Sequence, residues 1–231
     1  MSRLPDPLSR RDRQRQTREA LVFAARAVFA RDGYHGANLE VIAREAGFSK
    51  GAVYSNFAGK AALFLAVMDA NLETALAESW DPFSRVEDIP VAVSGDMDEE
   101  ELGAAMRGFA LATLEFIAAA ARDETLRAEM ATRMDRLLAA YTEIAREHGH
   151  DGEEMPAEEL GALLAALDQG VGMLVLTGTA AVDQRLLRAG ARRLLDPARA
   201  ATTDDDGGEG GLALHDRAVQ ARLAADIRDR S

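Results

Sequence analysis

Apolar residues recur at intervals of three and four positions along most of the chain, which is the spacing of one face of an α-helix. Alternation of apolar and polar residues, the pattern of a half-buried strand, occurs over no useful length. The sequence therefore predicts an all-α protein. The expected helices span residues 9–31, 39–46, 50–57, 60–80, 98–120, 124–148 (with a break near 132), 158–182 and 183–195.

The first three helices are separated by residues that favour helix ends. Gly33 is expected to end the first helix and Gly47 the second, because glycine readily adopts the left-handed conformation found at helix C-termini. Asn38 and Ser49 precede the second and third helices as expected N-caps. Two short helices joined by a turn that contains glycine, the second with small and polar exposed residues, are typical of a helix-turn-helix.

Charge is divided unevenly between this region and the rest of the chain. The whole chain has a formal net charge of −12, from 27 Lys and Arg against 39 Asp and Glu. Residues 1–60 hold 11 of the basic and 6 of the acidic residues, a net +5, which leaves −17 for residues 61–231. A basic region on an acidic protein indicates an anionic partner, and nucleic acid is the natural candidate.

Residues 18–68 resemble the DNA-binding domain of the TetR/AcrR family of bacterial transcriptional regulators. The resemblance covers about a fifth of the chain. It departs from the family pattern at Ala37, where the family usually has Thr, at Ser55, where an aromatic residue is frequent, and at Asn56, where His is common. The matching positions are Ala25, Phe29, Gly33, Tyr34, Ile42, Ala43, Ala46, Gly47, Ser49, Gly51, Tyr54, Phe57, Lys60 and Leu63.

The helix at 50–57 is the expected recognition helix. Small residues at its start would let the backbone approach DNA, and Tyr54 could bind a phosphate or press on a thymine methyl group. Lys50 and Lys60, the only lysines in the chain, flank it as expected phosphate anchors. Val53 and Phe57 would face inward.

The predicted DNA contacts extend beyond this helix. The basic arm at 10–18 could add phosphate contacts, or it could be an ordinary solvated tail. The family resemblance adds a backbone contact from Thr17, and Ser55 and Asn56 are expected to hold the specificity particular to this protein. A small three-helix core with an incidental polar edge is the plainer alternative. The predicted DNA-binding residues are Arg15, Thr17, Asn38, Ser49, Lys50, Gly51, Ala52, Tyr54, Ser55, Asn56 and Lys60.

The family resemblance implies that residues 61–196 form a helical domain that binds an effector and dimerises. Methionine and aromatic side chains there could line an apolar pocket, although an ordinary helical core explains most of them equally well. Asp168 and Gln169 interrupt an apolar helix and need partners, so they could bind an effector or a second subunit. The expected pocket residues are Met106, Phe109, Phe116, Met130, Met134, Leu137, Tyr141, Asp168, Gln169 and Met173.

The family resemblance implies a homodimer held by a four-helix arrangement of residues 158–182 and 183–195 from both chains. Glycines in the first of these helices would permit close approach of a second helix. Residues 197–231 are expected to form a flexible acidic tail. The expected interface residues are Leu164, Leu167, Val171, Leu174, Gly178, Leu187 and Leu194.

Composition and motifs argue against several other classes. The chain has no cysteine, which excludes disulfides and thiolate zinc sites. It has no phosphate-binding glycine loop and no G-x-S-x-G motif, so no enzyme is expected. The stretch EHGHDGEE, 147–154, fits a solvated turn better than a metal site. The N-terminus lacks the apolar core of a secretory signal, and Asp168 inside the apolar stretch 160–182 would cost about 2.5–3.5 kcal/mol at mid-bilayer.

Together with the family resemblance, the sequence predicts a cytoplasmic, homodimeric repressor that an effector releases from its operator. The chain is expected to have three parts. These are a helix-turn-helix domain at 1–60, an effector-binding and dimerisation domain at 61–196, and a tail at 197–231. The expected partners are a palindromic double-stranded DNA operator, a small apolar or amphipathic effector and a second copy of the chain, with no cofactor, metal or membrane. The alternative is a helical ligand-binding or enzymatic protein whose helix-turn-helix is vestigial.

Overall fold

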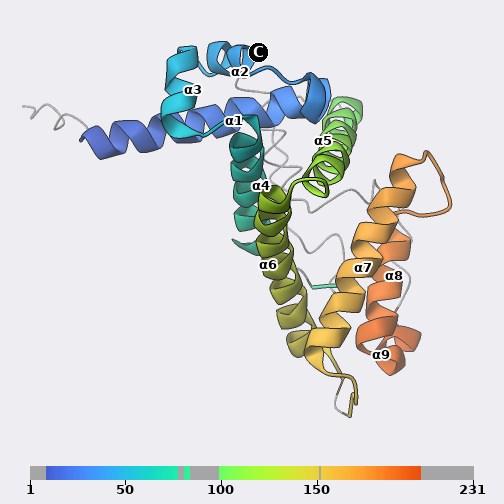
Figure 1. Cartoon of the computed structure of the whole chain (residues 1–231). Helices are drawn as coiled ribbons and strands as arrows, with labels where there is room; N and C mark the ends of the chain where they lie inside the picture. The colour runs from blue at the N-terminus through green and yellow to red at the C-terminus, as the bar shows by residue number, and fades with distance from the viewer. Residues whose placement is uncertain (1–8, 78–80, 84–98, 151, 204–231) are drawn as a thin grey trace, which may run out of the picture.

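The structure, a computed structural model, describes residues 9–77, 81–83, 99–150 and 152–203 (Figure 1). All regular secondary structure within these ranges is helical, which confirms the all-α prediction. The helices are α1 Arg10–Gly36, α2 Leu39–Glu45, α3 Lys50–Asn56, α4 Lys60–Ala77, α5 Glu99–Ala120, α6 Glu124–His148, α7 Ala157–Leu176, α8 Gln184–Leu195 and α9 Pro197–Thr202.

The turns that join α1, α2 and α3 follow the local signals of the sequence. Gly33 adopts φ 73° and kinks the end of α1, and Gly47 adopts φ 77° after α2. The Asn38 side-chain oxygen caps α2 by accepting a hydrogen bond from the Glu40 N–H at 2.8 Å. Ser49 occupies the N-cap position of α3, but its side chain makes no capping hydrogen bond. The helix-turn-helix therefore depends locally on two glycines and one asparagine cap.

Some helix limits differ from those expected. The break near residue 132 is absent, because α6 continues through Thr132, whose hydroxyl donates to the Ala128 carbonyl one turn back. The helix α7 ends at Leu176 instead of near 182, since Gly178 turns the chain with φ 80°. The short helix α9 replaces the start of the expected tail. The end of the expected helix at 60–80, the first residue of the expected helix at 98–120 and the tail from 204 onward lie outside the described residues.

The head formed by α1–α3 shares one hydrophobic core with α4, α5 and α6. An aromatic cluster lies at the junction: the Phe64 ring of α4 contacts Phe29, Tyr34, Phe109 and Phe116 at centroid distances of 4.8–5.7 Å. The buried cluster begins at Leu21 in α1 and continues to Met130 in α6. This shared core holds the head firmly against α4, α5 and α6.

The backbones of α1 and α5 touch beneath the head. A Cβ atom placed on Gly108 of α5 would lie 1.9 Å from the Ala30 carbonyl oxygen of α1, so only glycine fits there without displacing a helix. Farther along α5, the Glu115 carboxylate accepts a hydrogen bond from the His35 N–H at 2.9 Å. Because both contacts involve main-chain atoms of α1, the position of α5 is tied directly to that of the head.

Farther from the head, α6, α7 and α8 pack side by side (Figure 1). A Cβ atom on Gly161 of α7 would lie 2.6 Å from the Thr142 backbone nitrogen of α6, so these helices also approach closely. Two small apolar clusters hold α8 in place. Their buried members are Met106, Ala110, Val171, Val175 and Leu187 in one, and Ala145, Leu160, Leu164, Ala191 and Leu195 in the other.

Two described helices, over Gly103–Ala120 and Ala157–Leu176, are long and apolar enough to cross a membrane by length and composition. In the fold, α5 instead packs its apolar side chains against α1 and α4 in the shared core. In α7, the Asp168 carboxylate accepts a hydrogen bond from the neighbouring Gln169 amide at 3.0 Å. The apolar character of α5 is thus explained by packing within the protein.

Candidate nucleic-acid interface

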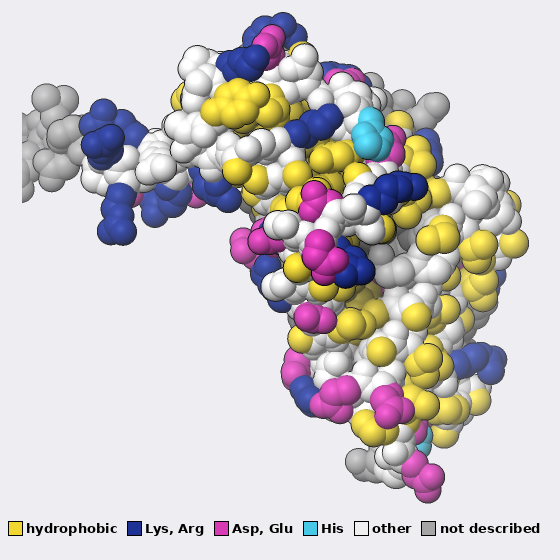
Figure 2. All heavy atoms as spheres, in the orientation of Figure 1, with side chains coloured by type: hydrophobic (Ala, Val, Ile, Leu, Met, Phe, Trp, Pro, Cys, Tyr) yellow, Lys and Arg dark blue, Asp and Glu magenta, His cyan; other side chains and the backbone are white. Residues whose placement is uncertain are grey.

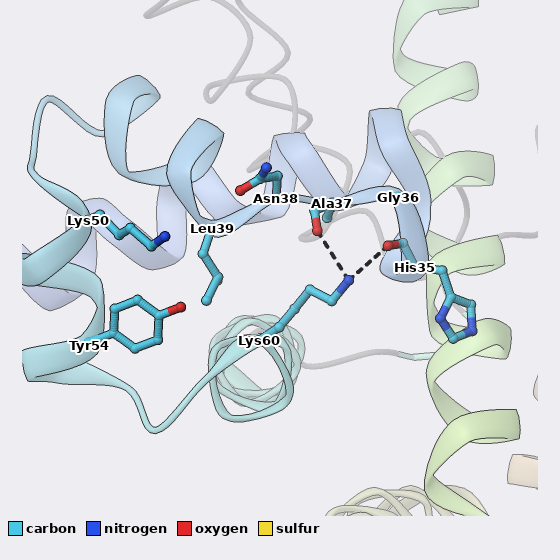
Figure 3. Close-up of a pocket in the computed structure, with 8 residues that line it drawn as sticks. All are labelled: His35, Gly36, Ala37, Asn38, Leu39, Lys50, Tyr54 and Lys60. Carbon is cyan, nitrogen blue, oxygen red and sulfur yellow. Dashed lines mark hydrogen bonds between the residues drawn. The ribbon is translucent and has the colours of Figure 1, made fainter.

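An open hollow of about 420 Å³ lies on the outer surface of the head (Figure 3). Residues from the end of α1, the start of α2, the exposed side of α3 and the first turn of α4 line it. They are His35, Gly36, Ala37, Asn38, Leu39, Lys50, Tyr54 and Lys60. The structure thereby brings together four of the predicted DNA-binding residues, Asn38, Lys50, Tyr54 and Lys60.

Tyr54 presents its ring and hydroxyl to solvent from the middle of α3. Its side chain is 54% exposed, although the helix that carries it is anchored by Val53 and Phe57, which are 0% and 4% exposed. As predicted, these two apolar residues face the core. A large aromatic residue held outward on a firmly packed helix can contact a phosphate or a base without much loss of conformational freedom.

Gly51 shows that the start of α3 has free space on its outer side. A Cβ atom at this position would meet only the Ser49 hydroxyl, at 3.7 Å, so packing within the described part of the chain does not require glycine. The neighbouring Ala52 is half-buried. An exposed glycine that the fold itself does not need is consistent with close approach of another molecule to the backbone.

The sequence suggested that Lys60 anchors a phosphate, but in the structure its ammonium bonds within the protein. Its ammonium donates to the main-chain oxygens of His35 at 2.9 Å and Ala37 at 3.1 Å (Figure 3). It also lies 5.0 Å from the Tyr34 ring centroid. Partial burial lowers the pKa of Lys60, an effect that the charge of Glu115 opposes. Lys60 therefore ties the first turn of α4 to the turn between α1 and α2, with one N–H left for a further acceptor.

Lys50 is paired with Glu40, a residue that the sequence analysis did not single out. The Lys50 ammonium lies 2.5 Å from the Glu40 carboxylate, and both side chains are more than half exposed. The hydrogen bond and charge of Glu40 raise the pKa of Lys50, and those of Lys50 lower the pKa of Glu40. The nine intervening residues form the rest of α2 and the turn before α3, so only the tertiary arrangement of α2 and α3 reveals this pair.

Ser55 and Asn56, predicted to hold specificity, bond to their own helix. The Ser55 hydroxyl donates to the Ala52 carbonyl at 2.9 Å, and the Asn56 amide donates to the same oxygen at 2.8 Å. Ser55 is exposed and Asn56 is half-buried. Contact with DNA would require either side chain to exchange this bond or to use its remaining polar atoms.

The basic arm is helical from Arg10 onward, as the first turns of α1, and projects beyond the head (Figures 1 and 2). Arg15 lies on this exposed part and pairs with Asp12 at 3.3 Å. The Thr17 hydroxyl donates to the Arg13 carbonyl at 2.9 Å. Figure 2 shows basic side chains along the projecting helix and acidic side chains over the lower body, as the division of charge in the sequence predicts.

Arg18 has a structural role that the sequence analysis missed. Its guanidinium donates to the Asn56 carbonyl at 2.9 Å and lies 4.3 Å from the Phe57 ring centroid. It thereby ties α1 to the end of α3 and fixes the angle between these two helices. The sequence had suggested either DNA contacts or a solvated tail for the basic arm, because no local pattern relates residue 18 to residue 56.

The structure does not bring the ten predicted effector-pocket residues together. Phe109, Phe116, Met130 and Met134 belong to the core shared with the head, whereas Met106 and Tyr141 lie in the two smaller clusters. Leu137 is half-buried on α6. On α7, Asp168 is half-buried, Gln169 is exposed and Met173 is 57% exposed. Core packing thus accounts for most of the apolar members of the set.

The predicted dimer-interface residues are also divided. Leu164, Val171 and Leu187 are 2%, 6% and 9% exposed, so they contribute to the core of one chain and not to its surface. Leu167 and Leu194 are half-buried. Leu174, 47% exposed, and Gly178 remain on the surface. The predicted set therefore mixes residues from the inward side of α7, such as Leu164 and Val171, with residues from its outward side, such as Leu174.

The two histidines at and just after the end of α6 pair with carboxylates. His150 Nε2 lies 3.1 Å from a Glu153 carboxylate oxygen, and His148 Nδ1 lies 3.7 Å from Asp81. Among the described residues, no group of three or more His, Cys, Asp or Glu side chains is placed to hold a metal ion.

The helix-turn-helix and its polar, solvent-facing hollow define a DNA-binding transcriptional regulator. Residues 21–67 match the family model of bacterial regulatory proteins, tetR family. The chain is 25% identical over 142 residues to the HTH-type transcriptional regulator YfiR of Bacillus subtilis, across 61% of this chain and 69% of YfiR. It is 33% identical over 70 residues to the HTH-type transcriptional regulator UidR of Escherichia coli, but these span only 30% of this chain and 36% of UidR.

Among solved structures, a TetR-family transcriptional regulator from Rhodococcus sp. matches with a TM-score of 0.55. The match covers 82% of this chain and 100% of that one at 20% sequence identity, and it therefore concerns the fold alone. Residues 21–67 thus form a tetR-type helix-turn-helix domain, and the sequence relatives of the chain are HTH-type transcriptional regulators.

Proposed function

We propose that the protein is a homodimeric repressor that binds a palindromic operator through two copies of α3. The observation that carries this proposal is the hollow, where Tyr54 and Lys50 of α3 face solvent beside the Asn38 cap of α2 (Figure 3). Aromatic, cationic and amide groups on a basic head can bind phosphates and base edges. The net charge of −17 on residues 61–231 would repel DNA and confine the contact to the head.

We assign the dimer contact to the outward side of α7, with a contribution from α8. Leu163, Met173 and Leu174 are 44%, 57% and 47% exposed on α7, and Leu186 is 44% exposed on α8. Gly170 lies within the same stripe, and a Cβ there would meet nothing within 4 Å. Figure 2 shows hydrophobic side chains along this surface. A stripe of large apolar residues is costly to leave in water, and a second copy of the stripe would cover it.

An effector would act through the contact between α5 and the head. We propose that a small apolar or amphipathic molecule binds in the body and displaces α5, which moves α1 through Gly108 and Glu115. A 100-fold loss of operator affinity requires only about 2.7 kcal/mol of coupling between the two binding events. The site of action would be the cytoplasm, where bacterial DNA is accessible.

Selection of bound fragments from random double-stranded DNA tests the proposal. A homodimer with two recognition helices should enrich a palindrome whose half-sites are centred about 34–36 Å apart, or a multiple of that distance. A reporter gene placed behind the enriched sequence should be expressed less when the protein is present. Enrichment of no sequence would favour a ligand-binding protein with a vestigial helix-turn-helix, and increased expression would point to an activator.

A further inference from the structure

The Glu40–Lys50 ion pair lies on the exposed side of the helix-turn-helix, at the start of the recognition helix. Lys50 is the first residue of α3, and Glu40 is the second residue of α2. The main-chain N–H of Glu40 is held by the Asn38 cap, which fixes the start of α2. Because N-terminal residues of a recognition helix contact base edges in the major groove, this pair lies where bases would be read.

The pairing makes Lys50 a poor phosphate anchor. A carboxylate within hydrogen-bond distance cancels its charge and would itself repel a phosphate. Ion pairs exposed to this extent contribute little to folding stability, so stability does not explain an acidic residue on a surface that faces DNA. A pair with no net charge gains little from the DNA backbone, but it still carries directed donors and acceptors.

These donors and acceptors complement the major-groove edge of a G·C base pair. Guanine presents two adjacent acceptors, N7 and O6, and cytosine presents the N4 amino donor beside them. A lysine ammonium has three N–H groups, of which Glu40 accepts one and two remain for guanine. The Glu40 carboxylate can in turn accept from cytosine N4. An A·T pair separates its two acceptors by the adenine amino group and adds the thymine methyl, so it fits this arrangement less well.

We propose that Glu40 and Lys50 act as one specificity-determining unit that reads a G·C base pair in each operator half-site, an inference that rests on the proposed function above. Lys50 donates to guanine and Glu40 accepts from cytosine. Glu40 also holds the flexible lysine side chain in position before DNA binds, which reduces the entropy lost on binding. The carboxylate thus lowers general affinity for DNA and raises discrimination between sequences.

Binding measurements on the selected operator test this inference. The variants are Glu40→Gln, Lys50→Gln and the control Glu45→Gln, each assayed on the operator and on copies in which each G·C pair is replaced in turn by A·T. Glu45 is a suitable control because it lies on the same helix but pairs with Arg31 of α1, at 3.0 Å. The Asn38 cap bonds to the main chain of residue 40, so Glu40→Gln should fold normally, which circular dichroism would verify.

At one G·C position the wild-type protein should discriminate against A·T by roughly 5- to 150-fold, the usual range for a well-formed base contact. Glu40→Gln should lose most of that discrimination while binding random DNA more tightly, and Lys50→Gln should lose it without any such gain. Glu45→Gln should keep the wild-type preference.

Two results would overturn the inference and leave the proposed function standing. The first is that Glu40→Gln discriminates between G·C and A·T as well as the wild type does at every position of the operator. The second is that Glu40→Gln binds every sequence more tightly by the same factor, which would mean that Glu40 acts only as a nearby charge. Failure of the wild-type protein to enrich any sequence would overturn both proposals together.

Discussion

Replacement of Gly108 by alanine tests the contact that joins the head to the body. The new Cβ atom would lie 1.9 Å from the Ala30 carbonyl oxygen, whereas a carbon atom in such a contact normally lies about 3.3 Å away, so the helices must separate by about 1.4 Å. The Ala30 carbonyl lies within α1 and cannot rotate aside as a side chain could. Overpacking of this kind typically costs about 1–3 kcal/mol, and the immobile neighbour places Gly108→Ala at about 2–3 kcal/mol.

Alanine also favours helix over glycine by about 1 kcal/mol, which offsets part of the strain and leaves a net loss of about 1–2 kcal/mol. For a chain of this length each kcal/mol lowers Tm by about 2–4 °C, so Gly108→Ala should melt about 2–8 °C below the wild type. Thermal unfolding followed by circular dichroism, at one protein concentration throughout, measures the difference.

The matched control is Gly51→Ala, where the new Cβ atom meets only the Ser49 hydroxyl at 3.7 Å. Without DNA it should melt at the wild-type temperature or slightly above it, although it should bind the operator more weakly because the added methyl group blocks close approach of α3. A Gly108→Ala protein as stable as the wild type would refute the close contact between α1 and α5, and with it the proposed route from effector to DNA.

Other substitutions test the remaining parts of the account. Tyr54→Ala should weaken operator binding greatly in a gel-shift assay while the helical circular dichroism signal stays intact. Lys60→Met removes the ammonium group that donates to two main-chain carbonyl oxygens. It should lower the free energy of unfolding, measured in urea, by about 0.5–1.5 kcal/mol. It should also lower the salt slope of DNA binding by about one unit if the remaining N–H contacts a phosphate. Leu174→Glu should make the protein monomeric, as measured by analytical ultracentrifugation. The control Leu111→Glu, at a site 48% exposed on α5, should leave the dimer intact. A dimeric Leu174→Glu protein would exclude the outward side of α7 as the interface.

Local signals were sufficient to predict the helices and the helix-turn-helix. Gly33 and Gly47 take the left-handed conformation at the expected helix ends, and Asn38 caps α2. These signals work because each depends on hydrogen bonds and backbone angles within a few residues. Ser49 occupies its predicted position without making the expected bond, since sequence identifies a residue capable of capping but not the rotamer that it adopts.

The predicted site was less complete, because its geometry depends on contacts between helices. Lys50 and Lys60 look equivalent in the sequence, yet one pairs with a carboxylate and the other donates to two main-chain oxygens. Arg18 and Glu40 carried no local mark of their roles. Their partners lie 38 and 10 residues away along the chain, and only the folded arrangement brings them within reach.

The sequence by itself determined the all-helical fold, the basic head and the helix-turn-helix, because helical periodicity, capping and net charge are properties of short segments. Only the tertiary structure decided which side of each helix is buried. Leu164 and Leu174 belong to the same apolar stretch, but α6 and α8 cover the first, and the second is left 47% exposed. Burial is a property of what packs against a residue, and apolar spacing alone cannot distinguish the core of one chain from a surface that a second copy would cover.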